Sequence, residues 1–371
     1  MLIGVPKEIK NHEYRVGLTP AGVRELIAAG HQVLVQHAAG AAIGLSDTDY
    51  LRVGATLVAD PAELFHRAAM IVKVKEPQLH ECEWLRSGQI LFTYLHLASD
   101  AQLTRQLIAS RATCIAYETV TDARGGLPLL APMSEVAGRM AIQAAAHHLE
   151  KAQGGRGLLL GGVPGVAPAE VLVLGGGVVG TNAARMALGL GARVTVVDRS
   201  LSRLRQLDEL FGPALTTLYS TTDAIERLLP HADAVIGAVL IPGAAAPRLV
   251  TRAMLKLMKP GSVLVDVAID QGGCFETSRP TTHEHPAYVV DNVIHYCVTN
   301  MPGAVARTAT FALTNATLPY VLALADEGVE ALLRNSDFRH GLNLHAGMVT
   351  LQVIADLFAL DHVDASKALL A

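Results

Sequence analysis

The chain has 371 residues, of which 51% are hydrophobic and 17% are charged, and its formal net charge is −4. These values allow large buried cores and argue against disorder. The negative net charge shows no basic excess that would favour binding to nucleic acid or to an anionic membrane. The most apolar stretch, 157–180, is interrupted by Pro164, Pro168 and Glu170, and the chain does not start with a signal-peptide pattern. We therefore expect a cytoplasmic protein of two domains that does not span a membrane.

The four cysteines show none of the spacings typical of redox or zinc sites. They form no Cys-x-x-Cys pair and have no neighbouring histidine pair, so we expect reduced and mostly buried thiols. No cluster of carboxylates and histidines suggests a metal, and the sequence predicts no metal site. The cysteines are Cys82, Cys114, Cys274 and Cys297.

The first third of the chain alternates between strand and helix patterns. The clearest helix pattern runs from Thr19 to Ala29, with Thr19 as N-cap, Pro20 in the first turn and Gly30 after the end. Such alternation predicts parallel strands joined by crossover helices. The expected strands are 2–5, 32–36, 70–74, 89–94 and 112–117.

A long helix is expected at 134–152, followed by a loop rich in glycine and proline at 154–168. A second alternating series then begins. Six strands are what a doubly wound dinucleotide domain requires. The expected strands of this series are 171–174, 193–197, 215–219, 234–239, 262–268 and 287–291.

From residue 303 onward the strand patterns disappear, and helices are expected at 304–325, 327–334 and 347–360. A purely helical tail of about seventy residues is unlikely to fold alone, so we expect it to pack on the N-terminal domain. The predicted fold class is therefore α/β with two doubly wound domains. A Rossmann dinucleotide-binding domain, 131–304, is inserted in a discontinuous substrate domain, 1–130 plus 305–371, which the C-terminal helices complete.

The strongest motif is an apolar strand that leads into G-x-G-x-x-G and then into a helix. Gly175 permits the tight turn, Gly177 lets backbone approach a pyrophosphate, and Gly180 lets the helix lie close to the strand. The helix starts at Val178 and Val179, so its N-terminus would face the phosphates. Because strand, glycines and helix agree, the motif predicts a dinucleotide site.

An acidic residue supports the same prediction. Asp198 ends the next strand, where a carboxylate accepts hydrogen bonds from both ribose hydroxyls and repels a 2′-phosphate. This favours NAD over NADP as the cofactor. Arg199 and Arg203 weaken the inference, because an arginine accepts that phosphate; Arg203 would otherwise lie over the adenine or reach a phosphate.

Seven segments spread along the chain carry a family resemblance: Gly4–Glu8, Arg15–Pro20, Lys73–Pro77, Tyr94–Leu97, Ala131–Glu135, Asp266–Gly273 and Asn300–Val305. These segments resemble alanine dehydrogenases, and the resemblance covers nearly the whole chain. They are shared in part with the NAD-binding subunit of proton-translocating transhydrogenase and, more loosely, with lysine-forming saccharopine dehydrogenases. His96 and Asp270 in their full contexts are closer to alanine dehydrogenase.

The resemblance implies the reversible reaction of L-alanine, NAD and water to pyruvate, ammonium and NADH. It also implies a homo-oligomer, in this family a hexamer, with the active site in the cleft between the domains. Two alternatives stay open: a soluble NAD(H)-binding component of a transhydrogenase, and a dehydrogenase for another small amino acid.

The substrate must be held by its carboxylate, and protons must move at its reacting end. Arg15 follows the first strand, and from its position alone it is either a solvated surface arginine or a ligand of that carboxylate. Lys75 ends the strand at 70–74 and would bind the carboxylate or the carbonyl oxygen. The family context favours substrate binding by both residues. His96 and Asp270 also follow strands and are the candidate acid and base, in an order that the sequence leaves open. Asp266 lies deeper and is expected to be structural.

Further residues are candidates by their position after strands or by the resemblance. Met133 and Ser134 begin the long helix, where they would touch substrate and nicotinamide, and Ser220 would approach the adenosine. The remaining cofactor candidates are Val239, Leu240, Val267, Ala268, Ile269, Asp270, Arg279, Val298, Thr299, Asn300 and Met301.

Overall fold

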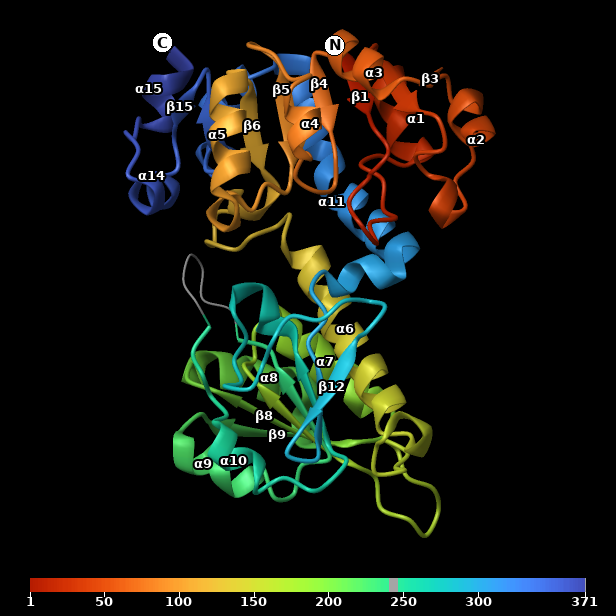
Figure 1. Cartoon of the computed structure of the whole chain (residues 1–371), viewed down its shortest axis with the longest axis vertical. Helices are drawn as coiled ribbons and strands as arrows, with labels where there is room; N and C mark the ends of the chain where they lie inside the picture. Colours follow the sequence, from red (N-terminus) through yellow and green to blue (C-terminus); the bar gives the residue numbers. More distant parts are fainter. Residues whose placement is uncertain (240–245, 371) are drawn as a thin grey trace. The chain divides into compact units, whose positions relative to one another are not determined.

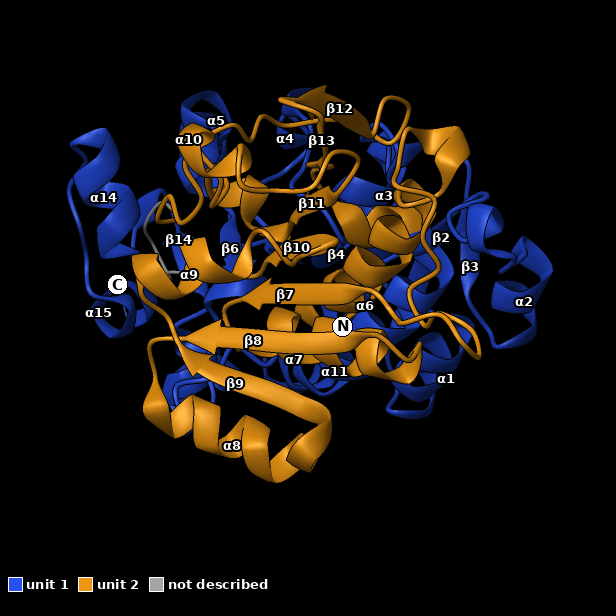
Figure 2. Cartoon of the chain, turned by 90° about the horizontal axis from the view of Figure 1, so that it is seen from below, with its two compact units in different colours: residues 1–133, 305–371 blue, residues 134–304 orange. Residues whose placement is uncertain are grey.

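A computed structural model describes residues 1–239 and 246–370, and it divides into two compact units. Unit 1 consists of residues 1–133 and 305–371, and unit 2 of residues 134–304. Figure 2 colours unit 1 blue and unit 2 orange. Each unit has its own sheet and its own core. The expected α/β class with two parallel-dominated sheets is confirmed.

Unit 1 is built on an eight-stranded sheet with the order β15-β14-β6-β5-β4-β1-β2-β3. The strands from β1 to β6 are parallel, as the alternating pattern predicts. The strand β3 has only three residues, and the sequence analysis missed it. The bounds are β1 Leu2–Val5, β2 Gln32–Gln36, β3 Thr56–Val58, β4 Met70–Val72, β5 Ile90–Thr93 and β6 Thr113–Ala116.

Short helices join these strands (Figure 1). The first shows why its sequence is helical: Thr19 accepts a hydrogen bond from the amide of Gly22, and Pro20 occupies the first position. This N-cap satisfies one of the amides that a helix start leaves without a partner. The bounds are α1 Pro20–Ala28, α2 Asp47–Arg52, α3 Pro61–Arg67, α4 Leu79–Cys82 and α5 Ala101–Ser110.

The C-terminal segment returns to unit 1, but the expectation that it has no strand is wrong. The strand β14, Leu342–His345, pairs antiparallel with β6, and β15, Met348–Val349, pairs antiparallel with β14. Ala346 and Gly347 join them with φ angles of 51° and 89°, as a two-residue hairpin turn requires. The helices are α11 Ala306–Glu327, α12 Glu330–Arg334, α13 Ser336–Arg339, α14 Gln352–Phe358 and α15 Ala365–Leu370.

Unit 2 contains a seven-stranded sheet with the order β12-β13-β11-β10-β7-β8-β9. Without β12, this is the strand order 3-2-1-4-5-6 of a doubly wound dinucleotide fold. Figure 2 shows β7, β8 and β9 side by side. The bounds are β7 Glu170–Leu174, β8 Arg193–Asp198, β9 Leu215–Tyr219, β10 Ala234–Gly237, β11 Val263–Asp266, β12 Ala287–Val290 and β13 Val293–Tyr296.

The last strand of this sheet differs from the expectation. The segment expected as the sixth strand, 287–291, contains β12, which is the antiparallel edge strand, and the sixth parallel strand is β13. Asp291 and Asn292 lie between them with φ angles of 48° and 63°. Such left-handed pairs make the tight hairpin turns in which Asn and Asp are favoured.

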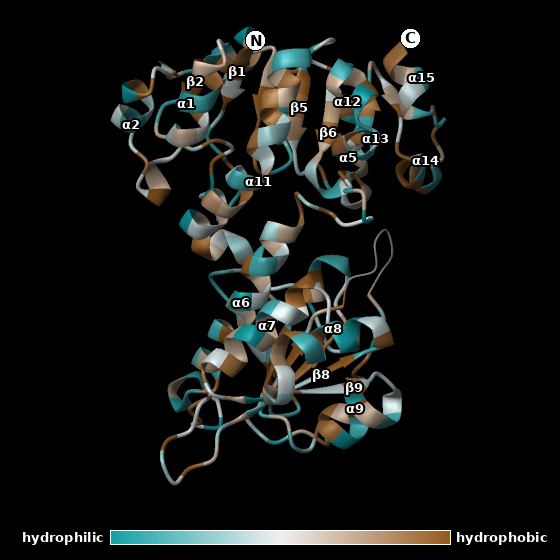
Figure 3. Ribbon diagram, turned by 180° about the vertical axis from the view of Figure 1, so that it is seen from behind, coloured by the Kyte–Doolittle hydropathy of each residue, from teal (hydrophilic) through white to brown (hydrophobic). Residues whose placement is uncertain are grey.

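Helices cover both faces of the second sheet, and two apolar clusters result. Along each strand alternate residues face opposite clusters, so Val173 and Val196 pack with α6 and α7, whereas Leu172 and Val235 pack with α9 and α10. Figure 3 shows strand β8 in the brown of hydrophobic residues. The helices are α6 Ala131–His148, α7 Val178–Gly189, α8 Leu201–Phe211, α9 Thr222–Leu228 and α10 Arg252–Leu255.

One segment, Met301–Glu327, is long and apolar enough to cross a membrane by length and composition alone, and 44% of its most apolar window is buried. It contains α11, which packs on α1 and α12 within unit 1. Leu313, Val321 and Leu324 of this helix are at most 1% exposed. These contacts are typical of a core helix.

A buried ion network lies beneath the loops of unit 1. The ammonium of Lys73, which is fully buried, lies 3.3 Å from Oε2 of Glu8 and 3.1 Å from Oε1 of Glu81. Burial alone would lower the pKa of Lys73, but the two carboxylates outweigh it and raise that pKa. Lys73 is therefore charged in the folded protein.

Lys73→Met should destabilise the protein by about 3–5 kcal/mol, because it leaves two buried carboxylates without their cation. Arg67→Met removes an exposed pair with Glu63 and should cost at most about 1 kcal/mol. The only tryptophan, Trp84, lies just after α4 and packs on Phe65, so its fluorescence in a urea titration reports on unit 1. Equal midpoints for the two variants would contradict the role given to Lys73.

Candidate functional site

The candidate substrate residues follow strands at one edge of the unit 1 sheet. The strands β4 and β5 are parallel, with Val72 opposite Phe92. Lys75 comes three residues after the end of β4, and His96 three residues after the end of β5. The carboxyl edge of a parallel sheet is where α/β proteins bind ligands.

His96 has an unusual backbone that its neighbours hold in place. Its φ angle is 47°, in the left-handed region that histidine seldom adopts. The carboxylate of Glu118 accepts hydrogen bonds from the amides of Leu95 at 3.1 Å and His96 at 2.7 Å, and its Oε1 lies 3.8 Å from Nδ1 of His96. The imidazole stacks on the ring of Tyr94, with 7° between the planes. These contacts fix the ring while its side chain stays 41% exposed.

Lys75 is half-buried, and a carboxylate also holds its backbone. Oε1 of Glu8 accepts hydrogen bonds from the amides of Val74 at 2.6 Å and Lys75 at 3.3 Å. Burial alone would raise the pKa of the adjacent Glu76, but the charges of Lys75 and Lys10 outweigh it and lower that pKa.

Arg15 is fully buried in unit 1, which excludes the alternative of a solvated surface arginine. Its Nε donates to Oε1 of Glu13 at 2.6 Å, and one terminal nitrogen donates to Oε2 at 2.5 Å. The other terminal nitrogen lies 3.0 Å from the sulfur of Met133. The charge of Arg15 also acts on the hydroxyl of Tyr94, whose ring contacts His96. Arg15 therefore contacts Met133, and Tyr94 contacts His96.

The glycine-rich turn of unit 2 has the geometry that its motif predicts. Gly175 has a φ angle of 98°, and a Cβ at Gly180 would lie 1.8 Å from the carbonyl oxygen of Gly175. A Cβ at Gly177 would meet nothing within 4 Å, and Gly177 and Val178 are exposed. The start of α7 thus offers open backbone where a pyrophosphate would fit.

Asp198 and Arg203 brace this turn. Oδ2 of Asp198 accepts the amide of Gly176 at 2.7 Å. Arg203 donates from Nε to the carbonyl of Gly176 and from a terminal nitrogen to the hydroxyl of Thr181, each at 2.6 Å. The amide of Ser220 donates to the carbonyl oxygen of Asp198 at 3.0 Å, so Ser220 lies next to the expected ribose-binding residue.

Asp270 lies on a short turn that Asp266 organises. The turn, η6, spans Val267–Gln271, and Asp270 is exposed on it. Asp266 is fully buried, as its expected structural role requires, and its carboxylate accepts the amides of Ala268 at 3.1 Å and Cys274 at 3.0 Å. Burial raises the pKa of Asp266 despite these bonds. Ile269 is buried and Val267 is half-buried beside it.

The other cofactor candidates differ in their distance from the glycine turn and in their burial. Val239 lies against Gly175, whereas Leu240 lies outside the described residues. The side chains of Val298 and Met301 are in the core of unit 2 rather than in an open pocket.

Four further candidates lie in separate environments. Arg279 lies over the ring of Tyr288 on β12, 4.2 Å from its centroid. The strand β12 is four positions in the sheet from β7, which leads into the glycine-rich turn. Asn300 has a φ angle of 56°, and Thr299 is half-buried beside it. Ser134 is half-buried in the first turn of α6.

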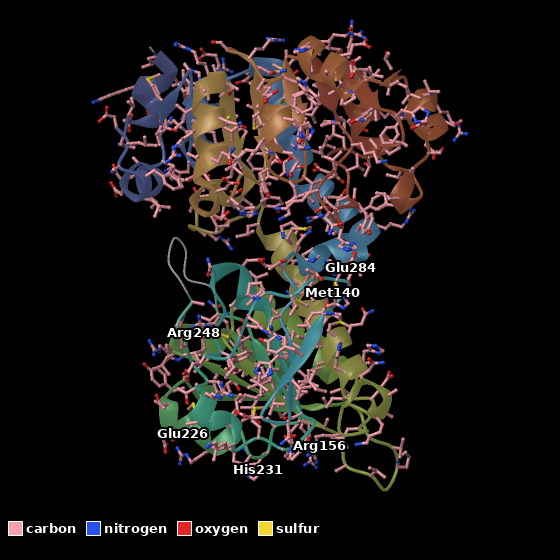
Figure 4. All side chains as sticks on the ribbon, viewed as in Figure 1. Met140, Arg156, Glu226, His231, Arg248 and Glu284 are labelled. Carbon is pink, nitrogen blue, oxygen red and sulfur yellow. The ribbon has the colours of Figure 1, made fainter. Side chains whose placement is uncertain are left out.

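At the other edge of the unit 2 sheet, where the strands begin, basic side chains form ion pairs with Asp233. Arg156 and His231, labelled in Figure 4, lie near the amino ends of the strands, where Nε of Arg156 is 3.3 Å from Asp233. The ammonium of Lys259 contacts the same carboxylate at 2.9 Å. Within residues 1–239 and 246–370, no three His, Cys, Asp or Glu side chains gather as ligands for one metal ion.

The sequence analysis did not assign roles to three carboxylates, although they hold its candidate residues. Glu8 binds the loop of Lys75, Glu13 binds Arg15, and Glu118 binds the loop of His96. Only Glu13 is near its partner in sequence. Glu8 and Glu118 each follow a strand that neighbours the strand before the candidate residue. This position identifies them as partners only once the strand order is known.

Two family models together match most of the chain. The model described as "Alanine dehydrogenase/PNT, N-terminal domain" matches residues 4–137, and "Alanine dehydrogenase/PNT, C-terminal domain" matches residues 141–352. An alanine dehydrogenase of Halomonas elongata is 64% identical over 99% of both chains. One of Bacillus subtilis is 54% identical over 100% of this chain and 98% of its own.

Solved structures show the same relationship. An L-alanine dehydrogenase structure has a TM-score of 0.94 and 51% identity, and it covers 97% of this chain and 99% of its own. A transhydrogenase from Sinorhizobium meliloti has a TM-score of 0.81 and 26% identity, over 94% of this chain and 98% of its own. With two family models along its length and relatives above 50% identity from end to end, this chain belongs to the alanine dehydrogenase/PNT family.

Proposed function

We propose that this protein is an NAD-dependent alanine dehydrogenase, which converts L-alanine reversibly to pyruvate and ammonium. The observation that carries the proposal is the grouping of Arg15, Lys75 and His96 at one sheet edge of unit 1, each held by a carboxylate. The 64% identity to an alanine dehydrogenase over the whole chain supports the choice of substrate.

A soluble NAD(H)-binding component of a transhydrogenase is the second candidate, favoured by the likeness at 26% identity. A component that only binds NAD(H) requires neither a buried arginine nor an exposed histidine on unit 1, which lacks the glycine-rich motif. We therefore rank it below the enzyme. A dehydrogenase for another small amino acid would share the same groups, and only a substrate panel separates it from an alanine dehydrogenase.

The cofactor proposal is NAD, bound at the turn from Gly175 to Gly180. The carboxylate of Asp198 already accepts the amide of Gly176, but its oxygens have further lone pairs for ribose hydroxyls. The three side-chain nitrogens of Arg203 donate hydrogen bonds to Gly176, Thr181 and Gln206. Of the two arginines that weakened the NAD prediction, this one is therefore committed to bracing the turn.

The residues of this chain can be given roles in the reaction. Bound NAD would supply the acceptor for the hydride that leaves the Cα of alanine. Arg15 and Lys75 hold the carboxylate, and His96 donates a hydrogen bond to the carbonyl oxygen of pyruvate and exchanges its proton. Asp270 orients ammonia or water and balances the positive charge on the substrate nitrogen. The two roles can be exchanged between His96 and Asp270, because the sequence does not decide which residue takes which role.

We further propose that the protein is a cytoplasmic homo-oligomer, a homohexamer, whose small-molecule partners are L-alanine, pyruvate and ammonium. The family resemblance supports the hexamer, and the composition supports the compartment. Size-exclusion chromatography with light scattering tests the oligomer directly, and a monomer at micromolar concentration would contradict it.

L-alanine should reduce NAD but scarcely NADP. A carboxylate that faces a 2′-phosphate at 4–6 Å costs about 1–4 kcal/mol near a protein surface, which is at least about fivefold in kcat/KM. NADH absorbance measures both values, and Asp198→Asn should narrow the difference. Equal use of both cofactors would show that Arg199 outweighs Asp198, and no turnover of any amino acid in a panel would refute the proposed function.

Arg15→Ala and Lys75→Ala should each raise the KM for pyruvate. A charge-assisted hydrogen bond contributes about 1.5–3 kcal/mol, or roughly 10–150-fold. The Kd for NADH, measured by its fluorescence, should stay nearly unchanged, since both residues belong to unit 1. Lys7→Ala, which removes an exposed cation from the same loop as Arg15, is the control. A wild-type KM in either variant would remove that residue from the substrate site.

His96→Ala and Asp270→Asn should each lose at least about a hundredfold in kcat, in the range of general acid–base catalysis. Both should still bind NADH. His66→Ala, on the exposed face of α3, should keep wild-type turnover. A folded His96→Ala variant with near-native kcat would move the proton-transfer role to Asp270 or Lys75.

A further inference from the structure

A short segment of unit 2 runs beside the loop that follows the sixth parallel strand. Residues 281–283, which we call the strap, form a parallel bridge between Thr281 and Val298. The amide of Thr281 donates to the carbonyl oxygen of Cys297 at 2.9 Å, and the amide of Thr299 donates to the carbonyl oxygen of Thr281 at 3.3 Å. The strap is therefore joined along its main chain to the loop after β13.

His283 joins the strap to the same loop through its side chain. Figure 4 labels Glu284, which directly follows the strap. Nε2 of His283 lies 3.2 Å from the carbonyl oxygen of Asn300, and since a carbonyl oxygen only accepts, Nε2 carries the proton and donates. The same oxygen accepts the amide of Gly303 at 2.9 Å. A carbonyl oxygen has two lone pairs, so the two bonds form together and fix the turn that starts at Asn300.

The backbone of Asn300 depends on such support. Its φ angle is 56°, in the left-handed region where a residue other than glycine is uncommon. On one side Val298 packs in the core of unit 2, and on the other Met301 does so at the start of the turn η7, Met301–Val305. Asn300 therefore lies between two anchored side chains, and a left-handed residue persists only where its surroundings hold it.

The strand order places this loop over one half of the dinucleotide site. A doubly wound fold binds the two mononucleotides of a dinucleotide on its two halves, on either side of the point where the strand order reverses. The glycine turn follows β7 and Asp198 ends β8, which assigns the adenosine to β7, β8 and β9. The nicotinamide half then falls to β10, β11 and β13, and the loop after β13 borders it.

We propose that His283 is a positioning residue for the nicotinamide of NAD, which fixes the turn at Asn300 and with it the loop 298–301. The inference rests on the proposed function and extends it to a residue outside the glycine motif. His283 acts through the carbonyl oxygen of Asn300 and not by contact with the reacting atoms. Loss of its hydrogen bond should therefore weaken binding of the nicotinamide half of the cofactor and leave binding of the adenosine half unchanged.

ADP-ribose separates the two halves, because it has the adenosine, the pyrophosphate and a ribose but lacks the nicotinamide. In His283→Ala the Kd for NADH should rise about two- to tenfold, the range for one hydrogen bond, and kcat should fall. The Kd for ADP-ribose should stay that of the wild type. Calorimetry measures both Kd values without turnover, and an unchanged value for ADP-ribose also shows that unit 2 is folded.

Three further variants test the contact itself. His283→Gln places an amide N–H near the position of Nε2 and should bind NADH as the wild type does. His283→Asn has a shorter amide that does not reach Asn300, and it should show the selective loss even if His283→Ala does not fold. His285→Ala removes an exposed imidazole two residues away and should change neither Kd.

Equal weakening of NADH and ADP-ribose binding in His283→Asn would show a merely structural histidine and overturn the proposal. A wild-type Kd for NADH in His283→Ala would overturn it as well, and so would a His283→Gln variant that binds NADH as weakly as His283→Asn. A wild-type protein that binds both ligands but forms no NADH from L-alanine would refute the proposed function, whereas the comparison of the two ligands would still decide the role of His283.

Discussion

The loops that follow the parallel strands depend on carboxylates that accept their backbone amides. Glu8 lies after β1 and holds the loop after the neighbouring β4, and Glu118 lies after β6 and holds the loop after β5. Asp198 at the end of β8 holds the glycine turn after β7 in the same way, and Asp266 holds the turn that follows its own strand. A charged acceptor makes a hydrogen bond roughly twice as strong as a neutral one, so one side chain can fix a loop that has no regular structure.

These cross-strand links convert an ordinary sheet edge into a rigid site. A loop is usually the most mobile part of an α/β unit, yet a binding residue must be held within a fraction of an ångström. His96 illustrates the result, because its left-handed backbone is stabilised by two bonds to Glu118 and by the stacked ring of Tyr94. Strain of this kind persists only where the surroundings over-determine it.

The misreading of β13 and the misreading of β14 have one cause. Both β13 and β14 follow or precede a two-residue turn with two left-handed residues, Asp291-Asn292 and Ala346-Gly347. A four-residue strand beside such a turn has too few residues to show a period of two, and its existence depends on a partner that sequence periodicity cannot identify. Because β14 pairs with β6, more than 220 residues away in the chain, only the tertiary structure reveals it.

The sequence by itself determined the α/β class, the parallel strands from β1 to β11 except β3, the glycine turn with Asp198, and the strand-end positions of Arg15, Lys75, His96 and Asp270. These features are local, since they depend on period, turn residues and spacing within a few dozen residues. The tertiary structure alone decided the burial of Arg15 and which carboxylate holds each loop. Those contacts follow from strand order, and strand order is set by the packing of the whole unit, because only there do residues 66 positions apart, such as Glu8 and Val74, become neighbours.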